Sequence, residues 1–279
     1  MIAMDFHMPH SGETFYGKYY VPGKVEAVVI LVHGLGEHCG RYEEHVIPAL
    51  LAVNLGVITY DQFGHGKTTG KRGHHPGFGE LLGCITEMIT KSEKIFGQKK
   101  IFLYGHSMGG NVVLNYGLRF PNSVSGIVAS SPFLKLAFDP PVWKMTMGKL
   151  MRKIYPSLTM PNGINPNHLS HDAEVVKAYQ ADPLNHNKVS PNYSVLLMET
   201  GNWAIQNANR LKIPVFIIHG TADQLTSYRA SEMFADNNKE MVKIKLYPGA
   251  YHELHNEPEK EKVLEEITKW VCKQLRPDF

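Results

Sequence analysis

Six short runs of apolar residues recur along this chain and constrain its fold more than any other feature. They are rich in valine, isoleucine and leucine and lie at residues 27–32, 56–60, 101–104, 126–129, 215–219 and 242–246. Helical patterns separate most of them, at residues 42–53, 79–95, 108–119, 227–234 and 258–274. Runs of this kind suit strands that are buried on both faces, as in a parallel sheet covered by helices. The sequence therefore predicts an α/β fold with a mostly parallel, doubly wound central sheet and helices on both faces.

A further strand is expected near the N-terminus. Residues 14–21 alternate loosely between polar and apolar side chains, and Pro22 and Gly23 follow as a turn signal. We expect this segment to form a hairpin that leads into the strand at residues 27–32.

The alternation of expected strands and helices is interrupted between about residues 133 and 202. This stretch is rich in proline and carries no clear buried strand. It is also too long to be a simple connection within a compact domain. The sequence predicts an inserted, mostly helical cap at residues 133–202, on a core formed by residues 1–132 and 203–279.

The composition excludes several classes of protein. Apolar residues make up 43% of the chain and charged residues 20%, which is unlike a disordered protein. The net charge of +3 is too small to indicate a nucleic-acid partner. The three cysteines, Cys39, Cys84 and Cys272, are too few and too far apart for a disulfide framework, and no pair of them indicates a metal site.

The chain also shows no pattern of a targeting or membrane-spanning segment. The N-terminal residues lack the apolar stretch of a signal peptide, and no window has about 18 uncharged apolar residues. We therefore expect a cytoplasmic protein. A peripheral association with membranes and the oligomeric state stay open.

One motif indicates a catalytic nucleophile. Residues 105–109 read Gly-His-Ser-Met-Gly and lie between an expected strand and an expected helix. A serine in this context sits on a tight turn at a helix N-terminus, and small residues two positions away let the strand and the helix approach. The pattern predicts Ser107 as the nucleophile of a serine hydrolase. The alternative is a glycine turn in which Ser107 only caps the helix.

A serine hydroxyl needs a base and an acid, which in this kind of fold follow in the order Ser, Asp or Glu, His. His252 comes after the last expected strand and is our choice of base, with His255 as the rival. Asp223 comes after the preceding strand and is our choice of acid, which would orient His252 and stabilise its charged form. The alternative for Asp223 is a turn or helix-capping residue.

Two backbone N–H groups are expected to form an oxyanion hole. One belongs to Met108, the residue after the nucleophile. The other is assigned to Leu35, in the glycine-rich loop at residues 33–38 that follows an early strand. The alternative is an ordinary glycine-rich turn.

Several motifs together resemble the monoacylglycerol lipase family. These are HGLGEHCGRY at residues 33–42, DQFGHG at 61–66, GHSMGG at 105–110, YQADPL at 179–184 and GAYHELH at 249–255. The resemblance runs from about residue 27 to the last expected helix. It implies the α/β-hydrolase fold and a triad of Ser107, Asp223 and His252, in agreement with the choices made from the residues.

The resemblance also implies polar groups that recognise glycerol, at Glu37, Arg41 and His255, with Tyr179 reaching in from the cap. A buried pocket for two free hydroxyls needs such donors and acceptors. The alternative for Glu37 and Arg41 is a local ion pair that fixes the loop, and both functions are compatible. Mammalian members of the family carry cysteines near the site, whereas Thr226 stands in the corresponding loop here.

Residues 142–155 can form an amphipathic helix within the cap. Trp143, Met147, Leu150 and Ile154 share one apolar face, and lysines and arginines lie between them. This face either lines an acyl tunnel and touches a lipid surface, or packs against the body of the protein.

The reaction expected from these residues is hydrolysis of a carboxylic ester through an acyl-serine intermediate, without a metal or cofactor. A monoacylglycerol is the favoured substrate, which would be split into glycerol and a free fatty acid. The alternatives are a broader carboxylesterase or lysophospholipase, an acyltransferase that uses an alcohol in place of water, and a non-catalytic binding module.

Overall fold

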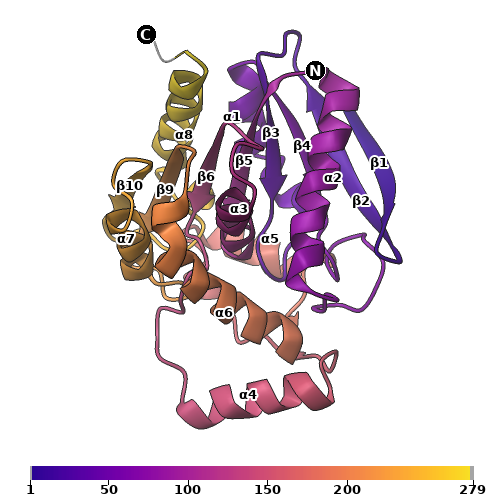
Figure 1. The fold of residues 1–279 in the computed structure, drawn as a ribbon, viewed down its shortest axis with the longest axis vertical. Coiled ribbons are helices and arrows are strands. Elements are labelled where there is room, and N and C mark those ends of the chain that lie inside the picture. The colour runs from indigo at the N-terminus through magenta and orange to yellow at the C-terminus, as the bar shows by residue number, and fades with distance from the viewer. Residues whose placement is uncertain (1, 277–279) are drawn as a thin grey trace.

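The computed structural model describes residues 2–276 of the 279-residue chain. Within these residues an eight-stranded sheet forms the centre of the molecule (Figure 1). The six strands from β4 to β10 in the sheet order run parallel, and β2 pairs antiparallel with both β1 and β4. Across the sheet the order is β1 (Ile2–His10), β2 (Glu13–Val21), β4 (Leu55–Tyr60), β3 (Ala27–Val32), β5 (Lys100–His106), β6 (Gly126–Ser130), β9 (Val215–Gly220) and β10 (Val242–Tyr247).

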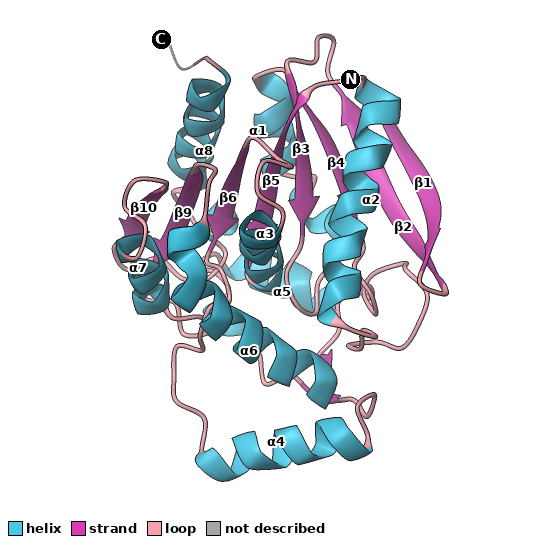
Figure 2. Ribbon diagram, viewed as in Figure 1, coloured by secondary structure: helices cyan, strands magenta, loops and turns pink. Residues whose placement is uncertain are grey.

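Helices cover both faces of this sheet, as Figure 2 shows. Strand β3 explains why, because its six residues are fully buried and alternate between two separate cores. Val28, Ile30 and Val32 belong to one core, whereas the residues between them belong to the other. The predicted α/β architecture is confirmed, and its helices are α1 (Val46–Ala52), α2 (Phe78–Phe96), α3 (Met108–Arg119), α7 (Tyr228–Asp236) and α8 (Lys260–Leu275).

The expected N-terminal hairpin is wrong in its pairing. Strand β2 pairs with β1 and with β4 and does not pair with β3. The hairpin closes at Ser11 and Gly12, both with positive φ, as a tight two-residue turn requires. The missed signal is the alternation of Ile2, Met4, Phe6 and Met8, which is typical of a half-buried strand.

The segment between β6 and β9 contributes no strand to the central sheet within the described residues. It holds helix α6, which packs against α3, and helix α4, which packs against α6 and stands apart from the sheet (Figure 1). The predicted amphipathic helix is present as α4, and α6 crosses residue 202, where the cap was predicted to end. The elements are α4 (Val142–Ile154), β7 (Met160–Pro161), α5 (Ala173–Ala181), β8 (Lys188–Val189) and α6 (Pro191–Asn207).

The C-terminal ends of the parallel strands position the candidate site. The loops after β3, β5, β9 and β10 meet at one edge of the sheet, and the segment between β6 and β9 lies over that edge (Figure 1). Ligand sites of open α/β sheets lie outside these carboxyl ends. None of the helices in residues 2–276 has the length and apolarity needed to cross a bilayer.

Candidate active site

Ser107 lies on the sharp turn between β5 and α3. Its backbone has φ +52° and ψ −114°, a conformation that non-glycine residues rarely adopt and that stores strain. A Cβ atom on Gly105 would lie 2.4 Å from the carbonyl oxygen of Gly109, and one on Gly109 would lie 2.0 Å from that of Val32. The turn therefore requires glycine at both positions, which is the physical reason for the Gly-x-Ser-x-Gly pattern.

The two residues predicted to form an oxyanion hole lie beside this turn. Met108 is the first residue of α3, so its N–H group has no acceptor within the helix. Leu35 follows β3 and lines the same cavity as Ser107. The Gly34 N–H donates to Glu37 Oε1 at 2.5 Å, which fixes the loop that carries Leu35. The structure thus brings both residues to Ser107, and their contact with an oxyanion stays a prediction.

The loops after β9 and β10 bring Asp223 and His252 together. His252 Nδ1 lies 2.6 Å from Asp223 Oδ2, and both residues are buried. Asp223 Oδ1 accepts the backbone N–H groups of Leu225 at 2.8 Å and Thr226 at 3.0 Å, which fixes the carboxylate. Because Nδ1 of His252 faces Asp223, Nε2 on the opposite side of the ring is the nitrogen that can accept from Ser107. His252 and Ser107 line one cavity.

The electrostatics of this pair suit a general base. Burial alone would raise the pKa of Asp223, but the neighbouring His252 and the hydrogen bonds from His219 and His252 hold this pKa well below its usual range. Burial alone would lower the pKa of His252, but the Asp223 carboxylate raises it above its ordinary value. The carboxylate therefore stays ionised and lies where it would stabilise an imidazolium formed by proton transfer to His252.

His255, the rival base, lies outside this pair. It is fully buried and stacks on Tyr42, with ring centroids 5.0 Å apart. The second histidine on Asp223 is His219, whose Nε2 lies 3.1 Å from Oδ2. The geometry therefore favours His252 over His255 as the partner of Asp223.

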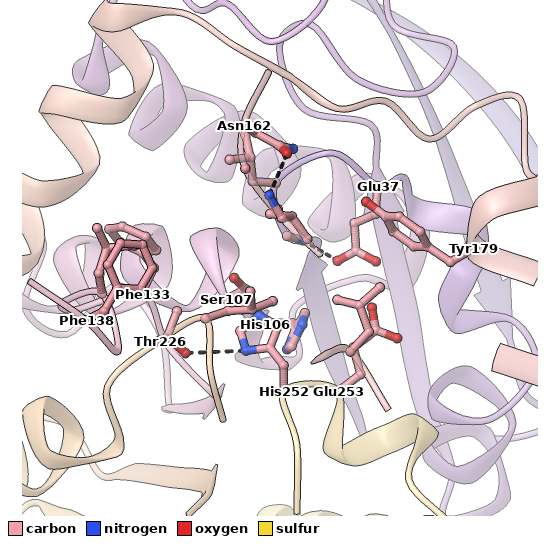
Figure 3. Close-up of a pocket in the computed structure, with 17 residues that line it drawn as sticks. Glu37, His106, Ser107, Phe133, Phe138, Asn162, Tyr179, Thr226, His252 and Glu253 are labelled. Carbon is pink, nitrogen blue, oxygen red and sulfur yellow. Dashed lines mark hydrogen bonds between the residues drawn. The ribbon is translucent and has the colours of Figure 1, made fainter. Parts of the chain in front are cut away.

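A small cavity of about 140 Å³ lies over Ser107 and is lined by His252, Leu35 and Tyr179. Figure 3 shows that polar and apolar side chains lie on different sides of this cavity, with Glu37, Tyr179 and Glu253 on one side of Ser107. The aromatic rings of Phe133 and Phe138 lie on the other side. The cavity thus has one end rich in carboxylates and one apolar end, with the candidate nucleophile between them.

The apolar end adjoins a larger chamber of about 530 Å³ that extends beneath helix α4. The two cavities share part of their lining, including Leu35, Phe133 and Phe138. Methionines and aliphatic side chains from α4 and α6 line much of the rest, among them Met145, Met147, Met151, Val195, Leu197 and Met198. Flexible methionine side chains suit an apolar ligand of variable shape.

A buried ion network lies behind the polar end. Arg41 Nη1 donates to Glu37 Oε2 at 2.7 Å and to Glu253 Oε1 at 2.5 Å, and Arg41 Nη2 donates to Glu253 Oε2 at 2.8 Å. The ion pair considered for Glu37 and Arg41 is therefore present. Of the four predicted glycerol-binding residues, Glu37 and Tyr179 line the cavity, whereas Arg41 and His255 lie behind its wall. The guanidinium of Arg41 lies 4.8 Å from the centre of the Tyr179 ring.

Three residues of this site have no role predicted from the sequence. Glu253 lines the cavity and is the main partner of Arg41. Thr226 Oγ1 donates to Asp223 Oδ2 at 2.8 Å, and His219 contacts the same oxygen. Their only signal in the sequence is their position next to the predicted acid and base.

Among residues 2–276, no group of three or more histidines, cysteines or acidic residues is arranged to hold a metal ion.

Comparisons with known proteins agree on one family. The family model described as serine aminopeptidase, S33, matches residues 23–259. The chain is 34% identical over 250 residues to a monoacylglycerol lipase of Mycolicibacterium smegmatis, and the match covers 89% of each protein. It is also 34% identical over 252 residues to an uncharacterized abhydrolase domain-containing protein of Dictyostelium discoideum, which covers 89% of this chain but 26% of that protein's length.

The fold has a close match among solved structures. The crystal structure of a monoacylglycerol lipase from Paleococcus ferrophilus matches with a TM-score of 0.85 and 35% sequence identity. The match covers 92% of this chain and 98% of that chain.

Proposed function

This chain belongs to the serine aminopeptidase S33 family, and from that premise we propose that it hydrolyses monoacylglycerols to glycerol and free fatty acids. The α/β-hydrolase fold and the family predicted from the sequence motifs are confirmed, and the chain is a serine hydrolase of carboxylic esters. The two relatives named monoacylglycerol lipases support the substrate. The observation that carries the proposal is the cavity around Ser107, which has carboxylates at one end and an apolar chamber at the other.

In the proposed mechanism, His252 Nε2 takes the proton of the Ser107 hydroxyl as its oxygen attacks the ester carbonyl. The N–H groups of Leu35 and Met108 hold the oxyanion that forms. The ester C–O bond then breaks, and His252 gives the proton to the departing glycerol oxygen. His252 next takes a proton from water as the water oxygen attacks the acyl-serine carbonyl. It gives this proton to the Ser107 oxygen as the bond from that oxygen to the acyl carbon breaks, which releases the fatty acid and restores Ser107. Asp223 stabilises His252 whenever it is charged.

The polar end of the cavity is proposed to bind the glycerol. Glu37 and Tyr179 line it and offer an acceptor and a hydroxyl to the two free hydroxyls of the substrate. Arg41 holds Glu37 in place from behind the wall, and His255 supports that wall through its stack on Tyr42. In this proposal Arg41 and His255 act by positioning the residues that line the cavity.

The apolar chamber is proposed to bind the acyl chain, with residues 133–202 as the cap. A chamber of about 530 Å³ next to Ser107 can bury a fatty acyl tail, which favours binding in proportion to the apolar area removed from water.

Helix α4 is proposed to contact lipid surfaces peripherally. Its apolar stripe is exposed rather than packed against the body, with Trp143 at 59% and Leu150 at 54% of their full accessibility. Exposed apolar side chains beside basic residues are typical of helices that lie on a membrane surface. The same stripe includes Met147 and Ile154, and the neighbouring basic residues are Lys144, Lys149, Arg152 and Lys153.

A panel of substrates tests this proposal. Release of acid is compared for a monoacylglycerol, a short nitrophenyl ester and a lysophospholipid, with Ser107→Ala as the background. We expect the highest kcat/KM for the monoacylglycerol and a loss of at least about 10³-fold in the variant. A higher kcat/KM for the nitrophenyl ester or the lysophospholipid would replace the proposal by a broader esterase or a lysophospholipase. Diversion of acyl groups to an added alcohol would indicate an acyltransferase.

A further inference from the structure

Two carboxylates line the polar end of the cavity, and a single guanidinium lies behind them. Glu37 and Glu253 both line the cavity, and each is 2% exposed. Arg41 lies between them and donates to both, with two bonds to Glu253 and one to Glu37. Figure 3 shows Glu37 and Glu253 facing the same space beside Ser107.

Both carboxylates are ionised at neutral pH. Burial alone would raise the pKa of Glu253, but Arg41 lowers it to about 2. Burial opposes ionisation of Glu37 in the same way, and Arg41 again holds this pKa well below its usual range. Two negative charges therefore face one positive charge, which leaves this group with a net charge of −1.

No neighbouring group of the described chain cancels this charge while His252 is neutral, which is the form in which it can act as a base. The cavity lining contains neither lysine nor arginine. Burial lowers the pKa of His255 to about 4 and that of His106 well below its usual range, so both rings are neutral at neutral pH. Asp182 lies 2.7 Å from His38 Nε2, and this pair is neutral or negative whichever form His38 takes. Asp223 and His252 together carry a charge of −1 when His252 is neutral and no net charge when it is protonated, so this pair adds no positive charge.

We propose that Glu253 is a specificity residue that makes this end of the cavity an electrostatic filter for the alcohol part of the ester. It admits esters of neutral polyols and rejects esters whose alcohol carries a phosphate or carboxylate group. The proposal rests on the proposed function, in which this end binds the alcohol. A negative group placed here would lie within a few ångströms of an uncompensated buried carboxylate, where charges interact far more strongly than in water.

Glu253 can be changed without dismantling the loop that carries Leu35. Glu37 Oε1 accepts both the Gly34 N–H and the Tyr42 hydroxyl, so this side chain fixes local structure. Glu253 instead contacts Arg41 and the side-chain amide of Asn256. Glu253→Gln keeps the shape of the side chain and an oxygen that accepts from Arg41. It leaves one carboxylate, Glu37, for one guanidinium, so the net charge of the group becomes zero.

The test compares two water-soluble esters that differ only by a phosphate group on the alcohol, butanoylglycerol and butanoylglycerol 3-phosphate. Both are used as monomers, so that a lipid surface plays no part in the result. For the wild-type enzyme we expect kcat/KM to favour the neutral ester by at least about 100-fold. For Glu253→Gln we expect this preference to fall at least tenfold. Glu257→Gln is the matched control. It removes a buried carboxylate from the same loop, but this carboxylate does not line the cavity, so the variant should keep the wild-type preference.

A second measurement needs no variant and keeps the test decisive if Glu253→Gln does not fold. Glycerol, glycerol 3-phosphate and 3-amino-1,2-propanediol are compared as inhibitors of the wild-type enzyme acting on a nitrophenyl butyrate. The cationic diol should inhibit most strongly and the phosphate least. Equal rates on both esters, or equal inhibition by glycerol and its phosphate, would overturn the filter while leaving the proposed function intact. Failure to hydrolyse butanoylglycerol or any longer monoacylglycerol would overturn the proposed function itself.

Discussion

Replacing Arg41 by methionine should strongly destabilise the protein, because it leaves Glu37 and Glu253 buried without a cation. Arg41 makes three charge-assisted hydrogen bonds of 2.5 to 2.8 Å to these carboxylates. Breaking a buried ion pair by removing one partner costs about 3–5 kcal/mol. Here one cation pairs with two carboxylates, so we expect the free energy of unfolding to fall by about 4–5 kcal/mol at pH 8, near the upper end of this range. At roughly 2–4 °C per kcal/mol, the melting temperature should fall by about 8–20 °C.

The loss of stability in Arg41→Met should depend on pH, because it arises from the charges of the two glutamates. In Arg41→Met, burial and mutual repulsion should raise the pKa of one glutamate above its unfolded value of about 4.3. A carboxyl whose pKa is raised by folding contributes stability below its unfolded pKa and loses it as the pH rises through its folded pKa. The variant should therefore lose less stability at pH 5 than at pH 8.

Urea unfolding followed by tryptophan fluorescence measures the loss of stability at both pH values, and thermal unfolding followed by circular dichroism measures the melting temperature. Arg152→Met is the matched control, because Arg152 pairs with Glu199 at 2.7 Å on the surface. An exposed pair of this kind contributes about 0–1 kcal/mol. The double variant Arg41→Met/Glu253→Gln should recover part of the loss. If Arg41→Met destabilised the protein no more than Arg152→Met, the network would not be the stabilising element described above.

Three further predictions concern catalysis. Asp223→Asn should lower kcat by about 10³–10⁴-fold with little change in fold, measured as fatty acid release, because the amide no longer favours the correct form of His252. The kcat/KM of the wild-type enzyme should rise with pH through a midpoint above 6.5, because the pKa of His252 is raised and only its neutral form can take the proton of Ser107; a midpoint well below 6.5 would contradict this. Gly148→Leu should fill part of the chamber between α4 and α6, since a Cβ at residue 148 already lies 3.5 Å from Val195. It should reduce kcat/KM for an 18-carbon monoacylglycerol about tenfold relative to a 4-carbon one, and an unchanged ratio would place the acyl chain elsewhere.

The sequence predicted those parts of the fold that depend on local patterns. The strand at residues 27–32 and the helix at residues 108–119 have the bounds expected for them, because unbroken apolar runs and helical periodicity report burial directly. The order of Ser107, Asp223 and His252 was predictable for a related reason. Each follows a parallel strand, and the C-terminal ends of parallel strands meet at one edge of the sheet.

Features that depend on distant contacts could not be predicted in this way. The partner of Glu253 is 212 residues away in the chain, so its role depends on how two loops meet above the sheet. Strand β1 alternates apolar and polar residues, but the choice of β4 rather than β3 as the second partner of β2 follows from tertiary packing. The placement of His255 behind the cavity wall likewise depends on its stack against Tyr42.

Labelling of the wild-type enzyme with a fluorophosphonate, combined with an assay of monoacylglycerol hydrolysis, tests the central claim most directly. We predict one label per chain, located by peptide mapping at Ser107, and a loss of fatty acid release in proportion to the label incorporated. Ser107→Ala should take up no label and release no fatty acid above background. Hydrolysis of monoacylglycerol that persists in the fully labelled enzyme or in Ser107→Ala would contradict the assignment of Ser107 as the nucleophile.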